Sequence, residues 1–455
     1  VIVRNVAAGT EYKTVTTDTG NYTISSLPAG VYELRVEASG FKKFVQQEIQ
    51  VRLLQTTRVN ATLEVGAPSD TVTVTATAPP LQTESAEQST NISGQLFNAM
   101  PINFGQTFGG SIRNWLSFIQ LAPGVSGNTH TANINGAPGG SFKIYLEGQD
   151  VTTTNDTVWT STVATASVET IGEFAIQTNN FSAEFGQVLG GVFNFTTKSG
   201  TNEFHGSAYE YLTNEAFSAH RPLSPTSRLP RPPKALDRKH DYGFTIGGPV
   251  RLPWLYDGRN KTFFFFNLEK YRNVTRSSGS LATVPTAAFR RGDFSAALTG
   301  RQLGVDVLGR PIMENAIYDP RTTRTVAVDG KQFVVRDPFP NNVIPESLLD
   351  PVALKIQGLI PNPDNNELFN NWDPRIPNQR FQQIPSVKID HNFNPNSKLS
   401  GYWSLQDTTQ ITGADGLPVP ITSRRDQKIY GHTVRVNLDQ TISPTFALHL
   451  GAGIL

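Results

Sequence analysis

One stretch, Gly190–Tyr211 (GGVFNFTTKSGTNEFHGSAYEY), constrains the fold of this chain more than any other. A first alternating run spans Val192–Thr197, and a second begins at Phe204. Side chains that alternate with period 2 indicate strands, and Ser199-Gly200 with Asn202 supplies a break between them. Upstream, the sequence is typical of small mixed domains, and downstream it is typical of aromatic-rich strands with very unequal loops. We therefore interpret this stretch as the joint between two domains of different kinds.

The strands after the joint have one apolar face and one polar face. In SVKIDHNF, for example, Val387 and Ile389 alternate with Lys388 and Asp390. Short connections alternate with long ones at about 214–239, 274–383 and 410–426. Both properties are typical of a transmembrane antiparallel β-barrel with a wet lumen. The predicted strands are seven: about 203–213, 240–248, 261–272, 384–393, 397–409, 427–438 and 444–455.

Seven strands predict an incomplete barrel, because single-chain bacterial barrels have even strand numbers. The chain also starts at Val1 within a strand-like run and stops within another, ALHLGAGIL, so we expect both ends to be cut. The aromatic run Phe263–Phe266 fits a strand near an interfacial aromatic girdle. A doubly buried strand of a soluble sandwich is the alternative interpretation of this segment.

Composition and motifs argue against an enzyme. Lys plus Arg is 39 against 38 for Asp plus Glu, so no net field attracts nucleic acid. The chain has no Cys, which excludes disulfides and thiolate chemistry within it. The glycines of the NINGAPGG segment match neither a P-loop nor GxGxxG and are predicted as turn glycines. Three glutamates that could form an acid/base pair are predicted as surface carboxylates: Glu169, Glu173 and Glu184.

The histidines show no metal-binding spacing, neither i,i+4 nor HExxH. No run reaches the ~18–20 apolar residues that a transmembrane helix needs, which does not exclude a barrel. We therefore predict no catalytic residue, no cofactor and no metal site. The seven histidines are His130, His205, His220, His240, His391, His432 and His449.

Short strand-like runs separated by turn signals fill residues 1–65 and predict a small β-sandwich. They are VIVRNV, EYKTVTT, YTISSL, VYELRVEA, FKKFVQQEIQV and RVNATLEV. The string TDTGNYTISSLPAGVYELRVEASGF resembles the carboxypeptidase-regulatory-like domain, a non-catalytic transthyretin-like fold. The resemblance implies a spacer or docking module, and sugar binding is the alternative.

Residues 66–95 are predicted as a linker that contains an extended segment, Thr71–Thr75. Its alternating Thr and Val favour an extended conformation, and an unpaired strand there would offer an edge to a partner. The alternatives are the last strand of the sandwich or a solvated linker.

Residues 96–200 predict a mixed α/β domain with a helix in NWLSFIQLAPGV and strands around a glycine-rich turn. Several motifs here, in order, resemble the plug of TonB-dependent receptors, in particular the Oar-like branch: MPIN…LAPGV, NINGAPGG…YLEGQDV and VETIGEFAIQTNNFSAEFGQVLGGVFNFTTKSGTNEFHGSAYEY. Two departures stand out. The segment INFGQTFGGSIRNW is longer and richer in glycine, and the family's Leu-Asp-Gly is Leu146-Glu147-Gly148.

The resemblance implies a mostly β protein: a β-sandwich (1–65), a linker (66–95), a mixed α/β plug (96–200) and the first strands of a transmembrane antiparallel barrel (201–455). Barrels of this family have about 22 strands, and the insert at about 273–384 would be an extracellular loop. The protein would take up a ligand across the outer membrane of a Gram-negative-type bacterium, in contact with outer-membrane lipid. The N-terminal domain and plug would lie on the periplasmic side.

The resemblance also implies a partner, a TonB-type energy-coupling protein, and gives the extended segment a role as a TonB box. The box residues would be Thr71, Val72, Thr73, Val74 and Thr75. A siderophore, an oligosaccharide, a peptide or cobalamin would each suit as ligand, and the ligand-contact residues stay unassigned. A secreted or surface adhesin or carbohydrate-binding protein is the alternative, although it leaves the ordered plug motifs unexplained. A hydrolase with added β modules lacks a nucleophile or metal constellation.

Overall fold

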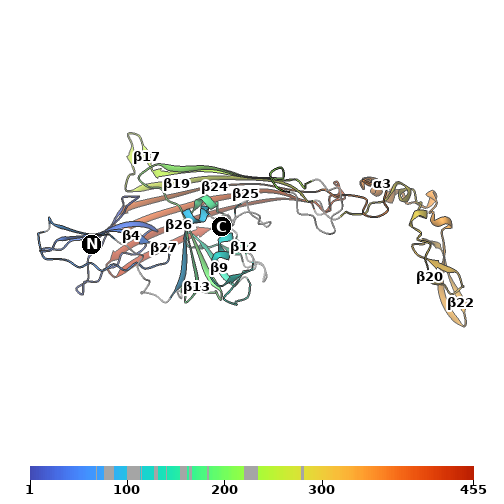
Figure 1. Ribbon diagram of the computed structural model, residues 1–455, viewed down its shortest axis with the longest axis horizontal. Helices are drawn as coiled ribbons and strands as arrows, with labels where there is room; N and C mark the ends of the chain where they lie inside the picture. Colours follow the sequence, from blue (N-terminus) through green and yellow to red (C-terminus); the bar gives the residue numbers. More distant parts are fainter. Residues whose placement is uncertain are drawn as a thin grey trace.

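The computed structural model describes residues 1–67, 69–75, 87–99, 113, 115–127, 132–139, 141–153, 161–162, 166–181, 184–219, 234–277, 281–413 and 415–455. A long antiparallel sheet forms the centre of the molecule (Figure 1). A small N-terminal sheet lies at one end of it, a mixed domain lies against one of its faces, and an elongated insert extends from the other end.

The N-terminal sheet has the strand order β2-β1-β3-β4-β5. Its core includes Tyr32, Leu34 and Phe44, and the buried Tyr32 and Leu34 alternate with half-buried positions, as expected for a sheet with one covered face. The strands are β1 (Ile2–Asn5), β2 (Glu11–Lys13), β3 (Gly30–Val36), β4 (Lys43–Val51) and β5 (Thr71–Thr75).

Two predicted strands of this domain, YTISSL and RVNATLEV, do not form ladders with it. They are extended segments that cover the sheet with alternate side chains, and the Tyr22 hydroxyl donates to the Val59 carbonyl at 2.8 Å. The expected second layer is therefore present as packing without a second hydrogen-bonded sheet. Its side chains are Tyr22, Ile24, Leu27, Val59, Ala61 and Leu63.

The mixed domain contains a five-stranded sheet of order β10-β9-β14-β13-β6, in which β9 and β14 run parallel. Phe174 stacks on Phe195 at 4.1 Å between ring centroids, and Trp115 meets Phe195 edge-on. The predicted helix in NWLSFIQLAPGV is confirmed as a 3-10 helix. The elements are β6 (Gln88–Ser93), α1 (Gly94–Ala99), η2 (Trp115–Leu121), β7 (Val125–Ser126), β8 (Asn133–Ile134), β9 (Phe142–Leu146), β10 (Gln149–Asp150), β11 (Thr152–Thr153), β12 (Ser161–Thr162), η3 (Val168–Thr170), β13 (Ile171–Asn179) and β14 (Gly191–Thr197).

The long sheet has seven strands in the described residues, in the order β15-β16-β19-β24-β25-β26-β27, and it is not closed. Each predicted strand after the joint is confirmed. The strands extend beyond the predicted limits toward the long loops, where β19 and β24 stay paired as far as Ser277 and Ile376. They are β15 (His205–Asn214), β16 (Asp237–Pro249), β19 (Thr262–Ser277), β24 (Ile376–Asn394), β25 (Ser397–Thr412), β26 (Arg425–Ser443) and β27 (Phe446–Ile454).

The two faces of this sheet differ in kind. The inner face, which we define as the one that contacts the mixed domain, carries polar groups such as Lys388 and Asp390. The outer face carries exposed apolar side chains, including Phe244, Ile246 and Ile389. The side chains of the Phe263–Phe266 run alternate between the two faces. Phe263 and Phe265 lie on the inner face and are 2% exposed, whereas Phe264 and Phe266 lie on the outer face.

The connections between strands are unequal, as predicted. At one end, the short-turn end, residues 395–396 and 444–445 join strands, and the connection from β16 to β19 is a small hairpin of β17 (Arg251–Leu252) and β18 (Tyr256–Asp257). At the long-loop end the insert contains two hairpins and short helices. Its elements are α2 (Ala287–Arg290), η4 (Ser295–Ala297), β20 (Gln302–Val305), β21 (Pro311–Met313), β22 (Tyr318–Val328), β23 (Lys331–Pro338), η5 (Pro340–Asn342), η6 (Glu346–Leu348) and α3 (Pro351–Leu359).

Helices contribute little to this fold. Helix α3 lies in the DPVALKIQGLIPNP segment, where Asp350 caps it by accepting from the amides of Val352 and Ala353. Among the described residues, no helix has the length and hydropathy to cross a membrane.

The joint itself connects β14 to β15, as predicted from its sequence. A Cβ atom at Gly200 would collide with the carbonyl oxygens of Phe264 and Gly248, so this position needs glycine for close backbone approach. The neighbouring Ser199 hydroxyl donates to the Asp390 carboxylate at 2.5 Å. The joint is thus held against the inner face where the mixed domain ends and the long sheet begins.

Candidate functional site

A buried guanidinium connects the mixed domain to the long sheet. Arg113 lies 2.8 Å from Glu169 of the mixed domain, 3.6 Å from Asp241 on β16 and 3.8 Å from Glu269 on β19. The same group lies over the ring of Tyr211, 4.1 Å from its centroid. The Arg113 side chain is 3% exposed. We call this set the Arg113 cluster.

The electrostatics of the Arg113 cluster favour the ionised guanidinium. Burial disfavours its charged form, but the carboxylates of Glu269, Asp241 and Glu169 outweigh burial and raise the pKa of Arg113. The Lys198 ammonium lies 3.7 Å from Glu169, although burial lowers the pKa of Lys198. Because removing one member of such a set leaves unpaired buried charge, the cluster couples the position of the mixed domain to the sheet. The prediction that Glu169 is a surface carboxylate was wrong, since it is 6% exposed.

A second buried cluster is centred on Glu147, in the Leu-Glu-Gly segment that departs from the family pattern. The Lys388 ammonium on β24 donates to both Glu147 carboxylate oxygens at 2.9 Å. The amide and hydroxyl of Thr197 donate to Glu147 Oε1 at 2.5 and 2.7 Å. Asn437 on β26 donates to the Glu147 carbonyl at 3.3 Å. Glu147 therefore joins the last strand of the mixed domain to two strands of the long sheet.

The N-terminal domain makes its own contacts with the other two parts. The Leu53 amide and the Asn91 side chain donate to the Glu173 carboxylate at 2.9 and 3.2 Å. Glu173 is 8% exposed, so its prediction as a surface carboxylate was wrong; Glu184 is exposed, as predicted. Burial raises the pKa of Glu173, against the two hydrogen bonds that lower it.

The joint supplies a further contact of the N-terminal domain. The Asn202 side chain donates to the Ala8 carbonyl and to Asn260 Oδ1, each at 2.6 Å. The Asn260 amide in turn donates to Asn202 Oδ1 at 2.8 Å. One asparagine at the joint therefore connects the N-terminal domain to a turn of the long sheet.

The five candidate TonB-box residues, Thr71, Val72, Thr73, Val74 and Thr75, form strand β5. The structure pairs it in parallel with β4, from Lys43↔Thr71 to Gln47↔Thr75, so of the interpretations left open it is the last strand of this domain and not an unpaired strand. The alternating Thr and Val residues favour a strand, which pairs with the edge of the sheet that β4 would otherwise leave open. β5 is the last strand in the order, and among the described residues no strand pairs with its other edge. Four of its five side chains are exposed.

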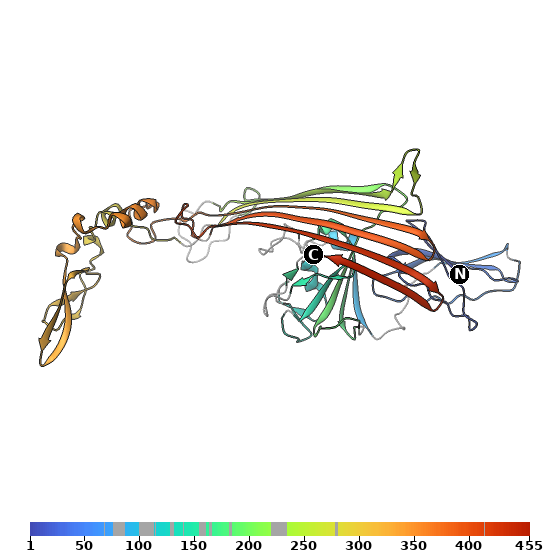
Figure 2. The same ribbon diagram turned by 180° about the vertical axis from the view of Figure 1, so that it is seen from behind.

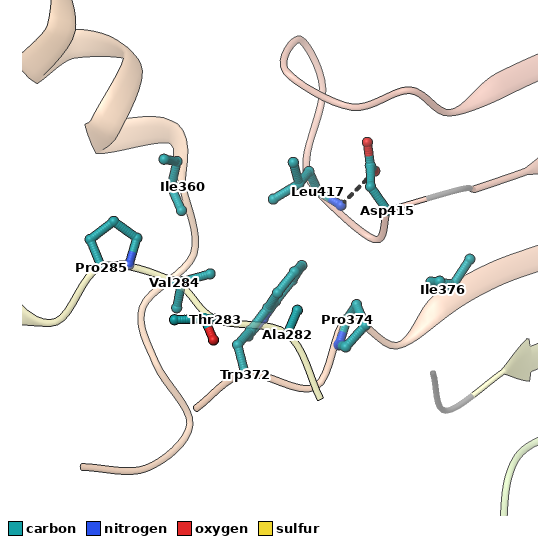
Figure 3. Close-up of a pocket in the computed structure, with 10 residues that line it drawn as sticks. All are labelled: Ala282, Thr283, Val284, Pro285, Ile360, Trp372, Pro374, Ile376, Asp415 and Leu417. Carbon is teal, nitrogen blue, oxygen red and sulfur yellow. Dashed lines mark hydrogen bonds between the residues drawn. The ribbon is translucent and has the colours of Figure 1, made fainter. Parts of the chain in front are cut away.

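A cavity of about 500 Å³ lies at the long-loop end. It is formed where the base of the insert meets the 415–424 loop, and the Trp372 ring points into it between Ile360 and Leu417 (Figure 3). The backbones of Ala282 and Trp372 exchange two hydrogen bonds, of 2.8 and 3.0 Å, which close the base of the insert. The lining is largely apolar: Ala282, Thr283, Val284, Pro285, Ile360, Trp372, Pro374, Ile376, Asp415 and Leu417.

Asp415 organises the loop on the far side of this cavity. Its carboxylate accepts from the amides of Leu417 and Ser423 at 3.0 and 2.7 Å and from the Thr422 hydroxyl at 2.8 Å. These donors, the Ser423 amide first, hold the pKa of Asp415 well below its usual range. The acid shapes the loop, and its oxygens are occupied by the protein's own donors.

Sequence reasoning missed Arg113 and Glu147 as contact residues. Each lies in one of the two segments that depart from the family pattern, so these departures could have indicated the two residues. Among the described residues, no group of three His, Asp or Glu side chains could hold a metal ion.

Comparison with known proteins gives two family matches. The outer membrane beta barrel domain matches residues 196–455, more than half of the chain, and the carboxypeptidase regulatory-like domain matches residues 1–64. The TonB-dependent transporter Oar of Myxococcus xanthus is 30% identical over 268 residues, which are 58% of this chain and 25% of that protein. The chain therefore spans about a quarter of the length of this relative.

Two solved structures are also similar. The outer membrane transporter YddB of Escherichia coli is 11% identical, with a TM-score of 0.42, over 80% of this chain and 38% of that one. A variant of the ferric enterobactin receptor PfeA of Pseudomonas aeruginosa, in complex with enterobactin, is 11% identical, with a TM-score of 0.35, over 82% of this chain and 49% of that one.

Proposed function

The chain belongs to the outer membrane β-barrel domain family, and we propose that it is part of a TonB-dependent receptor, which takes up a ligand through a plugged barrel. Membership of this family places the long sheet in the outer membrane, and the mixed domain is then the plug. One observation carries the proposal: the plug is held on the inner face of the sheet by the Arg113 cluster and by Glu147 and Lys388. Ionic contacts of this kind can separate into a wet lumen, whereas an apolar interface would resist separation.

Energy coupling would act through β5. Its free edge presents backbone groups without a strand partner in the described residues, which supports capture by β-augmentation. The TonB-type coupling protein would add a strand there and transmit force along residues 76–87 to β6, the edge strand of the plug sheet.

Ligand capture would begin at the long-loop end. The cavity around Trp372 supports binding of an apolar or aromatic group, because its lining offers an indole and aliphatic side chains. A siderophore, an oligosaccharide, a peptide and cobalamin all stay candidates for the whole ligand.

Coupling can be tested without knowing the ligand. Successive backbone N–H groups of a strand point to opposite edges, so Thr73→Pro and Val74→Pro remove donors from different edges of β5. We expect one of the two variants of the full-length receptor to lose binding to the purified periplasmic domain of the coupling protein. Wild-type binding by both variants would refute the assignment of β5.

Capture can be tested with a panel of a ferric siderophore, an oligosaccharide, a peptide and cobalamin. Trp372→Ala should weaken binding of the ligand that the wild-type receptor takes up. Phe369→Ala is the matched control, because Phe369 is an aromatic residue of the same insert, 69% exposed and outside the cavity. Cells that adhere to a surface through this protein but take up none of the panel would favour the adhesin alternative.

A further inference from the structure

The hairpin of β17 and β18 carries an apolar tip that no other part of the described structure covers. Trp254 is fully exposed, Leu255 is 81% exposed and Leu252 is 50% exposed. A surface tryptophan beside two leucines is unusual, because aromatic and aliphatic side chains grouped in this way generally meet a partner or a lipid phase. We therefore expect the tip of the hairpin to contact a partner or a lipid phase.

The direction in which the hairpin points indicates that its tip contacts lipid. It rises from the short-turn end on the side of the long sheet opposite the plug, and the two views, from front and back, agree (Figures 1 and 2). That side is the outer face, where Phe244 and Ile246 of β16 are about two-fifths exposed, at 43% and 42%. The apolar tip therefore continues the face that the family assigns to lipid, at its periplasmic edge.

The hairpin is held in this position by its own contacts. The Val250 amide donates to the Thr262 carbonyl and the Gly258 amide donates to the Val250 carbonyl, each at 2.9 Å. The Tyr256 hydroxyl is hydrogen-bonded to the Thr262 hydroxyl. These bonds tie the base of the hairpin to the first residue of β19, so the tip cannot fold back onto the sheet without breaking them.

The charges around the tip suit a phospholipid surface. Arg251, Arg259 and Lys261 are exposed at the base of the hairpin, and Asp257, paired with Arg259 at 2.5 Å, is the one carboxylate among residues 250–261. Cations at the base of an aromatic tip can pair with lipid phosphates when the tip contacts the acyl region. Tryptophan is the side chain most enriched, together with tyrosine, at such an interface.

We propose that the β17–β18 hairpin is a lipid anchor, which inserts Trp254 and Leu255 into the periplasmic leaflet of the outer membrane. Arg251 and Lys261 contact the lipid phosphates. The anchor fixes the rotational position of this part of the barrel wall beside the joint, and it acts independently of ligand uptake.

The test measures the depth of Trp254. The full-length protein is folded into vesicles of phosphatidylethanolamine and phosphatidylglycerol, with bromine on the acyl chains either near the headgroup or near the chain end. The Trp254 signal is the difference in fluorescence between the wild type and Trp254→Phe. We expect bromine near the headgroup to quench most of this signal, bromine near the chain end to quench less, and aqueous iodide to have little effect.

Two outcomes overturn the proposal. Quenching by iodide but not by bromine would mean that the tip lies in water, and protection from both would mean that protein covers it. Leu255→Asp should release the Trp254 signal from bromine quenching, whereas Val334→Asp, at a position 70% exposed in the insert, should not. If Leu255→Asp does not fold, the Trp254→Phe difference still decides the question.

Discussion

The Lys388 ammonium on barrel strand β24 lies 2.9 Å from both carboxylate oxygens of Glu147, a plug residue 241 positions earlier in the chain. Both side chains are nearly buried, at 10% and 7% exposure. The same ammonium donates to the Thr197 carbonyl at 3.2 Å, at the end of the last plug strand. A single lysine of the barrel therefore contacts the plug at its Leu-Glu-Gly turn and at its exit.

Lys388→Met should loosen the plug. It leaves the Glu147 carboxylate buried without its cation, which costs about 3–5 kcal/mol when one partner of a buried pair is removed. Hydrogen exchange in the full-length receptor should then be faster in β9 and β14, the plug strands that flank the pair. The Glu147→Gln/Lys388→Met double variant should recover most of the protection, because both charges of this pair are removed.

Lys331→Met is the control for this experiment, since Lys331 is exposed at the start of β23 in the insert. Equal exchange in Lys388→Met and in this control would show that the pair does not hold the plug.

Arg113→Leu should destabilise the plug more than any change at Lys198. Arg113 serves three carboxylates at 2.8, 3.6 and 3.8 Å, and its loss costs about 3–5 kcal/mol or more if their charges stay buried. Arg113→Lys should be intermediate, because one compact ammonium cannot replace a planar guanidinium that also lies over an aromatic ring. Denaturant unfolding followed by plug-strand exchange gives the order.

Lys198→Met is the matched comparison, since this ammonium meets only the Glu169 side of the cluster at 3.7 Å. If it destabilised the plug as much as Arg113→Leu, the guanidinium would not be the centre of the cluster.

The strands of the barrel were predictable because their signal is local. Val387, Ile389 and their neighbours alternate in sequence as they alternate between lipid and lumen, and each of the seven strands followed. The hairpin of β22 and β23 had the same signal and was missed. Asp329-Gly330 lies between alternating runs and adopts positive φ at both residues, 49° and 74°, as a two-residue hairpin turn requires.

The clusters were not predictable, because their members come together only in the folded chain. Glu169 and Glu173 have neighbours in sequence that resemble those of any surface glutamate, and partners distant in sequence, such as Arg113 and Leu53, explain why they are buried. The pairing of β5 with β4 also depends on contacts that periodicity does not encode: Thr71–Thr75 reads equally well as a free strand or an edge strand.

Glu173→Gln should change the pH dependence of stability. Burial raises the pKa of Glu173 above its usual 4.5, so the folded protein binds this proton more tightly than the unfolded chain. The contribution of Glu173 to stability is therefore complete below about pH 4.5 and is lost as the pH rises through the folded pKa. The wild type should lose stability relative to Glu173→Gln over that interval. Thermal unfolding of both proteins between pH 4 and 8 measures the difference, and parallel profiles would contradict it.

Asn202→Ala should release the N-terminal domain from the barrel. The substitution removes two donated bonds of 2.6 Å, to Ala8 and Asn260, and one accepted bond of 2.8 Å. Partly exposed hydrogen bonds contribute about 0.5–1.5 kcal/mol each, so the domain should become mobile without unfolding. Spin labels at Val15→Cys and Asn396→Cys, in a chain that has no cysteine of its own, report the distance between domain and barrel.

A narrow distance distribution is expected in the wild type and a broad one in Asn202→Ala. Asn21→Ala is the control, because in the described part of the chain the Asn21 side chain donates to Thr19 of the same domain. Since Asn202 lies at the joint, a mobile domain would also free the turn at Asn260, while the half-buried Ser199 hydroxyl, bonded to Asp390, should keep the joint in place. An unchanged distribution in Asn202→Ala would mean that the remaining contacts position the domain, among them the Leu53 amide on Glu173 and the Asn202 amide on the Ala7 carbonyl.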